Sequence, residues 1–220
     1  MTEEWIMISL FRIFINAILA GLFIGLAGAV FLSVPNKFAG AFLFGFGLFT
    51  IVCYGFKLYT GAIGYLVNQG KNALKYAGTL AVIWLGNWIG TWFVGTALRN
   101  SRVGADLAKK AAALCMVKNA DGRLSLLVLG FFCGMLMYLA VESFRRKDDI
   151  PAPGRILMVF LCVMVFILSG FEHCIADMFY YSAAGGWNPD SLVTILIITA
   201  GNSLGGFLLP AAEMIRHEKA

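Results

Sequence analysis

Six long stretches of this 220-residue chain contain no Asp, Glu, Lys or Arg. They cover residues 13–36, 38–56, 76–98, 124–141, 156–171 and 191–212. A helix needs about 20 apolar residues to cross the hydrocarbon core of a bilayer, so most of these stretches are long enough to cross alone. Charged residues make up 13% of the chain, against roughly 25% in soluble domains. The pattern excludes a soluble fold and predicts an all-α integral membrane protein in a lipid bilayer.

Two of the expected membrane spans are interrupted. We expect six transmembrane helices, near residues 10–33, 38–67, 76–98, 124–143, 154–181 and 190–213. The second contains the polar, glycine-containing run Lys57–Gly61, and the fifth contains Ser169–His173. Backbone groups freed by such a break must be bonded by protein or by water in a cavity. The breaks therefore mark a functional region inside the membrane.

The two breaks occupy corresponding places in the two halves of the chain. Thr60 precedes His173 by 113 residues (173 − 60), and the first and fourth charge-free stretches begin 111 residues apart (124 − 13). Because three helices per half is an odd number, the two copies must have opposite topology. We therefore expect an inverted 3+3 repeat with broken helices 2 and 5, which in transporters marks a substrate pathway near the midplane. The expected organisation is a single transmembrane channel domain over residues 1–220, whose parts are repeat 1 (about 10–98), a surface loop (99–123) and repeat 2 (about 124–213).

Most charges fall in loops. The 99–123 loop carries six basic and two acidic residues, and its segment Gly104–Lys118 is alanine-rich, which predicts a surface helix. This loop either concentrates small anions outside the membrane or is an ordinary solvated loop. A small excess of Lys and Arg on the N-terminal side, nine against seven, favours cytoplasmic N- and C-termini in the cell (inner or plasma) membrane. The formal charge of +5 is spread over several loops, which argues against a nucleic-acid partner.

His173 is the main candidate for chemistry within the membrane. It is the only His outside the C-terminal tail, and a buried imidazole can exchange a proton with a passing weak acid. The alternative is a structural His that bonds the helix break. We expect the neighbouring Glu172 to cap the N–H groups of the helix that begins near Cys174. In the other break, Thr60 offers a hydroxyl, and Lys57 either adds a positive charge or extends to the membrane surface.

No pattern indicates a metal ion, a cofactor or a nucleotide. We expect no cofactor and no metal site. A membrane enzyme that uses Glu172 and His173 as an acid–base pair is the weakest alternative, because the spans offer few other polar groups. The sequence assigns no place to Asp177.

The second break resembles the signature of the formate/nitrite transporter family. Residues Gly170–Phe179 read GFEHCIADMF, and eight of these ten positions agree with the usual GFEHSIANMF. Leu58–Gly61 is similar to the family's ELFTG element, with Lys57 in place of the acidic residue and Tyr59 in place of Phe. Gly201–Gly206 is similar to the GNxxGG of the last helix.

The resemblance implies an aquaporin-like fold that assembles as a homopentamer with one pore per subunit. It implies that Thr60 and His173 lie at the pore centre, with Asn202 and Lys118 as supporting polar groups. Lys118 matches a family lysine that precedes an Asn by sixteen residues, a position held here by Gly134. Apolar constrictions of the pore would map to Phe44, Leu48, Leu58, Tyr59 and Phe166.

We therefore expect a membrane channel or proton-linked transporter for small monovalent weak-acid anions such as formate, nitrite or hydrosulfide. A bare anion in a low-dielectric constriction costs many kcal/mol. Basic residues would attract the anion, and protonation near His173, by the imidazole or by water, would let it cross as a neutral acid. The alternative is a neutral-solute pore for water or ammonia with the same architecture.

Overall fold

The computed structural model describes residues 3–217, and over that range the regular structure is helical. The helices are α1 (Glu3–Ser33), α2 (Lys37–Tyr54), α3 (Tyr59–Ala62), the 3-10 helices η1 (Ile63–Asn68) and η2 (Gly70–Asn72), α4 (Ala73–Arg99), α5 (Gly104–Ala120), α6 (Arg123–Arg145), α7 (Ala152–Ser169), α8 (Cys174–Ala184) and α9 (Pro189–His217). Six of them are long and apolar enough to cross a membrane, in agreement with the six predicted spans. Lys219, one of the nine basic residues counted on the N-terminal side, lies outside the described residues.

The second predicted span consists of two helical pieces. α2 ends at Gly55, which adopts φ 71° and donates its N–H to the carbonyl oxygen of Ile51. This left-handed conformation ends a helix and suits glycine, which has no Cβ to clash. Residues 56–58 are not helical, and α3 begins at Tyr59. The break therefore precedes the predicted Lys57–Gly61 segment, and the continuation after Ala62 is a 3-10 helix rather than an α-helix.

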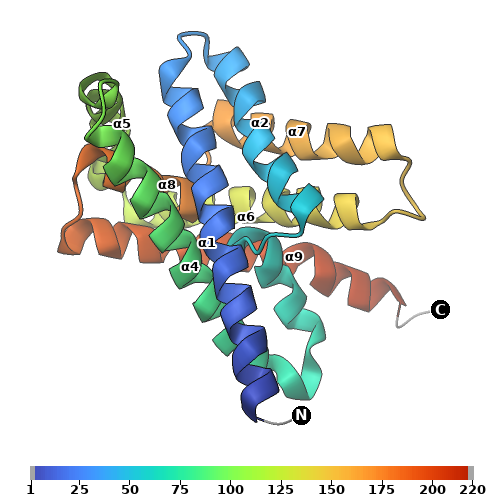
Figure 1. Ribbon diagram of the computed structural model, residues 1–220. Helices are drawn as coiled ribbons and strands as arrows, with labels where there is room; N and C mark the ends of the chain where they lie inside the picture. Colours follow the sequence, from blue (N-terminus) through green and yellow to red (C-terminus); the bar gives the residue numbers. More distant parts are fainter. Residues whose placement is uncertain (1–2, 218–220) are drawn as a thin grey trace.

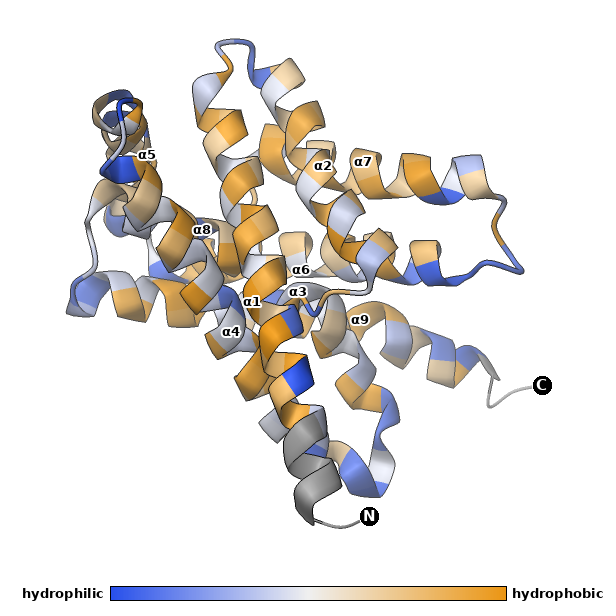
Figure 2. Ribbon diagram, viewed as in Figure 1, coloured by the Kyte–Doolittle hydropathy of each residue, from blue (hydrophilic) through white to orange (hydrophobic). Residues whose placement is uncertain are grey.

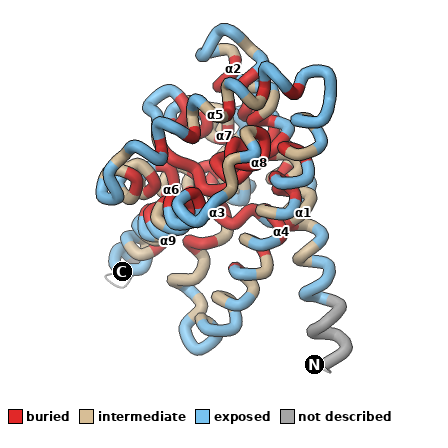
Figure 3. The backbone as a smooth tube through the Cα atoms, turned by 90° about the vertical axis from the view of Figure 1, so that its left-hand side faces the viewer, coloured by how far each residue is buried: buried red, intermediate tan, exposed pale blue. Residues whose placement is uncertain are grey.

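The fifth predicted span is divided in the same way. α7 ends at Gly170, which adopts φ 73°, and α8 begins at Cys174. The ten residues from Cys174 to Ala183 are all buried, so α8 is surrounded by the other helices. Figure 3 shows buried segments gathered in the centre of the molecule, around α8, and exposed segments at its edges.

Two helix pairs form the framework of the molecule. α1 packs along α4, and α6 packs along α9 (Figure 1). Each pair meets at a glycine opposite an asparagine. A Cβ on Gly21 of α1 would overlap the backbone carbonyl of Asn87 on α4, and a Cβ on Gly134 of α6 would overlap that of Asn202 on α9. Gly134, which departs from the family pattern, thus permits the close approach of α6 and α9.

Apolar residues cover most of the long helices, and the hydrophilic residues concentrate at helix ends and connections (Figure 2). Large side chains such as Phe93 and Leu157 are more than half exposed, as expected for a surface that faces lipid rather than water.

The 99–123 loop contains the predicted helix, α5, but this helix is not confined to the surface. Leu107, Ala111, Cys115 and Lys118 form a buried face of α5 that packs against α8. This packing brings Lys118 next to the second break.

Candidate functional site

Thr60 and His173 meet between the two breaks. The Oγ1 atom of Thr60 and the Nε2 atom of His173 are 2.9 Å apart, and both side chains are almost wholly buried. Nδ1 of His173 accepts a hydrogen bond from the backbone N–H of Ala176 at 3.1 Å. Because Nδ1 accepts, the neutral ring carries its hydrogen on Nε2 and donates it to Thr60. Within residues 3–217 no other partner bonds the Thr60 hydroxyl, so its own hydrogen is available to a solute.

Aromatic rings enclose one side of this pair. The ring of Phe166 stacks on the His173 ring with 5.6 Å between centroids, and Phe44 contacts Phe166 edge-on at 5.8 Å. Leu48 and Leu58, the other aliphatic residues expected to narrow a pore, are also buried. The polar pair therefore lies in apolar surroundings, where a fixed hydrogen bond is stronger and an unpaired charge is costly.

Asn202 bonds the second break to the framework helices. Its side-chain Oδ1 accepts a hydrogen bond from the backbone N–H of Cys174 at 2.9 Å. Its Nδ2 donates to the carbonyl oxygens of Glu172 and Gly130, each at 2.8 Å. One buried amide thus satisfies backbone groups on both sides of His173.

Asn87 makes the same contacts at the first break. Its Oδ1 accepts from the backbone N–H of Tyr59 at 2.9 Å, and its Nδ2 donates to the carbonyl oxygens of Lys57 and Ala17 at 2.8 Å. The four residues lie 115, 115, 115 and 113 positions before their counterparts at the second break (202 − 87, 174 − 59, 172 − 57 and 130 − 17). Sequence reasoning missed Asn87. This spacing, close to the 113 residues between Thr60 and His173, was the signal that pointed to it.

The prediction that Glu172 caps α8 is wrong. His173 caps α8 through Ala176, and Asn202 satisfies the N–H of Cys174. The Glu172 carboxylate instead forms a buried ion pair with Lys118. The ion pair outweighs capping because α5 packs against α8 and places the ammonium of Lys118 beside the carboxylate.

Lys118 has a second acidic partner. Its Nζ is 2.9 Å from Oδ1 of Asp177, and the other carboxylate oxygen of Asp177 is buried without a hydrogen-bond partner among residues 3–217. Burial lowers the pKa of Lys118, but Asp177 and Glu172 outweigh burial and raise the pKa above its ordinary value. The positive charge of Lys118 is therefore taken up by two carboxylates.

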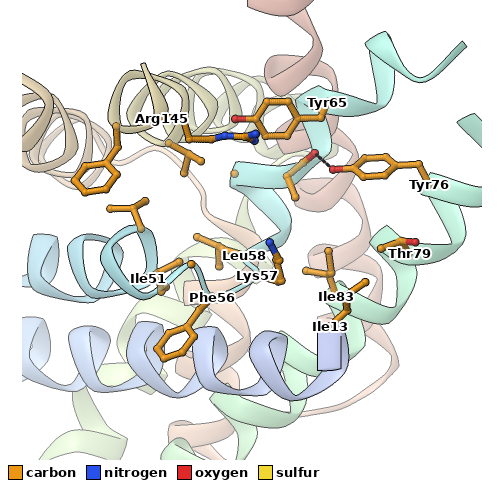
Figure 4. Close-up of a pocket in the computed structure, with 16 residues that line it drawn as sticks. Ile13, Ile51, Phe56, Lys57, Leu58, Tyr65, Tyr76, Thr79, Ile83 and Arg145 are labelled. Atoms are coloured by element: carbon orange, nitrogen blue, oxygen red, sulfur yellow. Dashed lines mark hydrogen bonds between the residues drawn. The ribbon is translucent and has the colours of Figure 1, made fainter. Parts of the chain in front are cut away.

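Lys57 lies on the other side of the first break, at the wall of a cavity of about 480 Å³. Figure 4 shows Lys57 beside Leu58, with Tyr65, Tyr76 and Arg145 on the opposite wall. Lys57 is exposed to solvent, whereas Leu58 is buried.

Tyr59 faces away from this cavity. Its hydroxyl lies 2.9 Å from Oγ of Ser203 on α9. This partner accounts for a tyrosine where the related motif has phenylalanine, because a buried hydroxyl needs a hydrogen-bond partner.

The structure thus brings Thr60, His173, Glu172, Lys118 and Asn202 together around the breaks, and it leaves Lys57 in a separate cavity. Besides Asn87, sequence reasoning did not identify Arg145, because only the fold places the end of α6 beside the first break.

Comparisons with known proteins agree with this arrangement. A family model described as "Formate/nitrite transporter" matches residues 2–215. The chain is 25% identical to the nitrite transporter NirC of Escherichia coli (strain K12) over 215 residues, which cover 87% of this chain and 78% of the relative. It is also 25% identical over 213 residues to a probable formate transporter of Methanothermobacter thermautotrophicus, covering 85% of this chain and 77% of the relative.

Among solved structures, the chain is similar to a pentameric formate channel with formate bound. The TM-score is 0.80 and the sequence identity 23%, over 96% of this chain and 98% of the other. This likeness establishes the fold of a six-span helical channel.

Proposed function

The chain belongs to the formate/nitrite transporter family, and from this premise we propose that it carries small monovalent weak-acid anions, such as formate, nitrite or hydrosulfide, across the cell membrane together with a proton. The observation that carries the proposal is the 2.9 Å contact between Thr60 and His173, which joins the two breaks in buried, apolar surroundings.

The proposed architecture is an aquaporin-like inverted repeat within one domain, with repeat 1 over about 10–98 and repeat 2 over about 124–213. The matching contacts of Asn87 and Asn202 support it, because the same four backbone positions are bonded at the same spacing in both halves. Three helices per repeat return the chain to the same side, so both termini would be cytoplasmic. By analogy with the similar pentameric formate channel, the chain would assemble as a homopentamer with one pathway per subunit.

Passage through the apolar rings requires a neutral solute. A bare anion beside Phe44, Leu48, Leu58, Tyr59 and Phe166 would lose its hydration without an opposite charge to replace it. The neutral acid escapes this cost, and the free hydrogen of the Thr60 hydroxyl can hold its carboxyl or oxo group by a hydrogen bond.

Water rather than His173 would supply the proton. To donate a proton and remain neutral afterwards, the ring would first have to carry hydrogens on both nitrogens. Its Nδ1 already accepts the Ala176 N–H, and a second hydrogen would break that bond and place a positive charge in an apolar site. In this proposal His173 orients the Thr60 hydroxyl and caps α8.

The test is a flux panel in proteoliposomes with formate, nitrite, hydrosulfide and lactate. Thr60→Val removes the hydroxyl at nearly constant shape, and Thr60→Ser is the matched control that keeps it. We expect formate flux to fall at least about tenfold in Thr60→Val, the effect of a lost hydrogen bond of about 1.4 kcal/mol at the barrier, and to stay near wild type in Thr60→Ser.

Equal flux in both variants would refute the role of Thr60. An osmotic swelling assay without weak acid tests the alternative of a neutral-solute pore. Fast water or ammonia flux combined with no formate flux would overturn the proposal.

A further inference from the structure

We propose that the cavity at the first break is an anion-binding site, in which Lys57 and Arg145 hold a small, hydrated, monovalent anion in front of Leu58. The inference rests on the proposed function and adds the place where the anion is collected. It also assigns a role to Arg145, which the pathway described above does not include.

The two ends of the site differ in available charge. Lys118, at the second break, is buried and bound by both Glu172 and Asp177, so that group has a formal charge of −1 when all three are ionised. No net positive charge remains there to attract an anion. A loading site must therefore use other cations.

Lys57 is held in a position suited to this task. Its backbone N–H donates to the carbonyl oxygen of Asn16 at 3.2 Å, and its carbonyl oxygen accepts from Asn87 at 2.8 Å. The backbone is thus fixed immediately before Leu58, while the side chain extends into the cavity (Figure 4). Among the described residues no carboxylate lies within ion-pair distance of Lys57, and none lines the cavity.

Arg145 occupies the opposite wall. Its guanidinium lies over the Tyr65 ring at 4.5 Å, and the Tyr65 hydroxyl donates to Glu142 at 2.7 Å. The other oxygen of Glu142 accepts from Arg146 at 3.1 Å, so this carboxylate is engaged with Tyr65 and Arg146. The ring orients the Arg145 charge without neutralising it.

A second cavity continues the basic surface outward. It is lined by Arg145, Lys147 and Arg155, together with Val52, Cys53 and Phe144. The two cavities share Val52, Phe144 and Arg145, so Arg145 stands at the boundary between them. Asp148 and Asp149, in the same connection, line neither cavity. Positive charge therefore continues from the surface to Leu58.

The size of the inner cavity fits a hydrated ion. A volume of about 480 Å³ holds on the order of ten waters at roughly 30 Å³ each. An anion can keep much of its hydration here and exchange it for a proton only at Leu58. Cations in such a cleft raise the local concentration of anions and the rate of their entry, and salt weakens this effect.

The test uses charge replacement at a single position. In a Cys53→Ser background, which removes the exposed cysteine of the described chain, Lys57→Cys is purified and labelled in detergent with a cationic or an anionic methanethiosulfonate reagent. Formate uptake is then measured in proteoliposomes over a range of formate concentrations. Lys71→Cys, in η2 and outside both cavities, is the matched control.

We expect Lys57→Cys to raise the apparent KM for formate about fivefold at low salt. The cationic label should restore it to within about twofold, and the anionic label should raise it further. The control should respond to neither label, and the differences should shrink in 0.5 M inert salt because of screening.

An apparent KM that is the same with either label overturns the inference. If wild-type protein carries formate in that experiment, the proposed function stands without it. If the wild type carries no weak-acid anion at all, the proposed function itself fails.

Discussion

The Thr60 hydroxyl lies 2.9 Å from Nε2 of His173, and the two residues are 113 positions apart in the chain. The hydrogen bond connects the helix after the first break to the cap of the helix after the second. Because Nδ1 of His173 is occupied by Ala176, the contact has a defined direction, from the imidazole to the hydroxyl.

The two roles of His173 can be separated by substitution. His173→Asn keeps a side chain that caps helices well but removes the imidazole, whereas His173→Phe removes both functions. We expect formate flux to fall at least about tenfold in both. Only His173→Phe should also lose stability, by about 1 kcal/mol, measured as the unfolding midpoint in detergent. Wild-type flux in His173→Asn would mean that the histidine acts only as a cap.

Asn87 and Asn202 should prove equivalent in their effect on stability. Replacing either by Leu leaves three buried backbone groups without their partner, at about 1–3 kcal/mol each. We expect both variants to unfold at clearly lower temperature than wild type, with similar losses. A large loss in Asn202→Leu and none in Asn87→Leu would contradict the correspondence of the two halves.

Much of this arrangement is visible in the sequence. The charge-free stretches predicted the six spans, because a bilayer demands long apolar helices. The breaks were visible because Gly55 and Gly170 end helices in the only conformation that makes glycine necessary. The partners of Glu172 were not predictable, because they depend on the packing of α5 against α8, which no local pattern encodes. Asn87 lay in an ordinary apolar run and was identifiable only by its spacing to Asn202.

Gly134 should resist replacement by the asparagine that the related motif has there. A Cβ at this position would overlap the backbone of Asn202, which cannot move without separating α6 from α9. We expect Gly134→Asn and Gly134→Ala to lower the unfolding midpoint and the yield of folded protein. Gly78→Ala, where a Cβ meets no atom within 4 Å, is the control and should be neutral or stabilising. A stable Gly134→Asn protein would contradict the close packing.

Lys118 and Asp177 should show strong coupling. Lys118→Met leaves two buried carboxylates without a cation and should destabilise the protein by about 3–5 kcal/mol. Adding Asp177→Asn removes one of these charges, so the double variant should be more stable than Lys118→Met alone. Additive losses in a double-mutant cycle of unfolding in detergent would show that the ion pair contributes nothing.

The ratio of protons to formate carried tests the central claim most directly. Proteoliposomes with a pH-sensitive dye inside receive an inward formate gradient, and formate uptake and internal acidification are measured together. The account predicts one proton for each formate, with both fluxes reduced equally in Thr60→Val. Rapid formate uptake without acidification, accompanied by a negative internal potential, would show that the bare anion crosses and would contradict it.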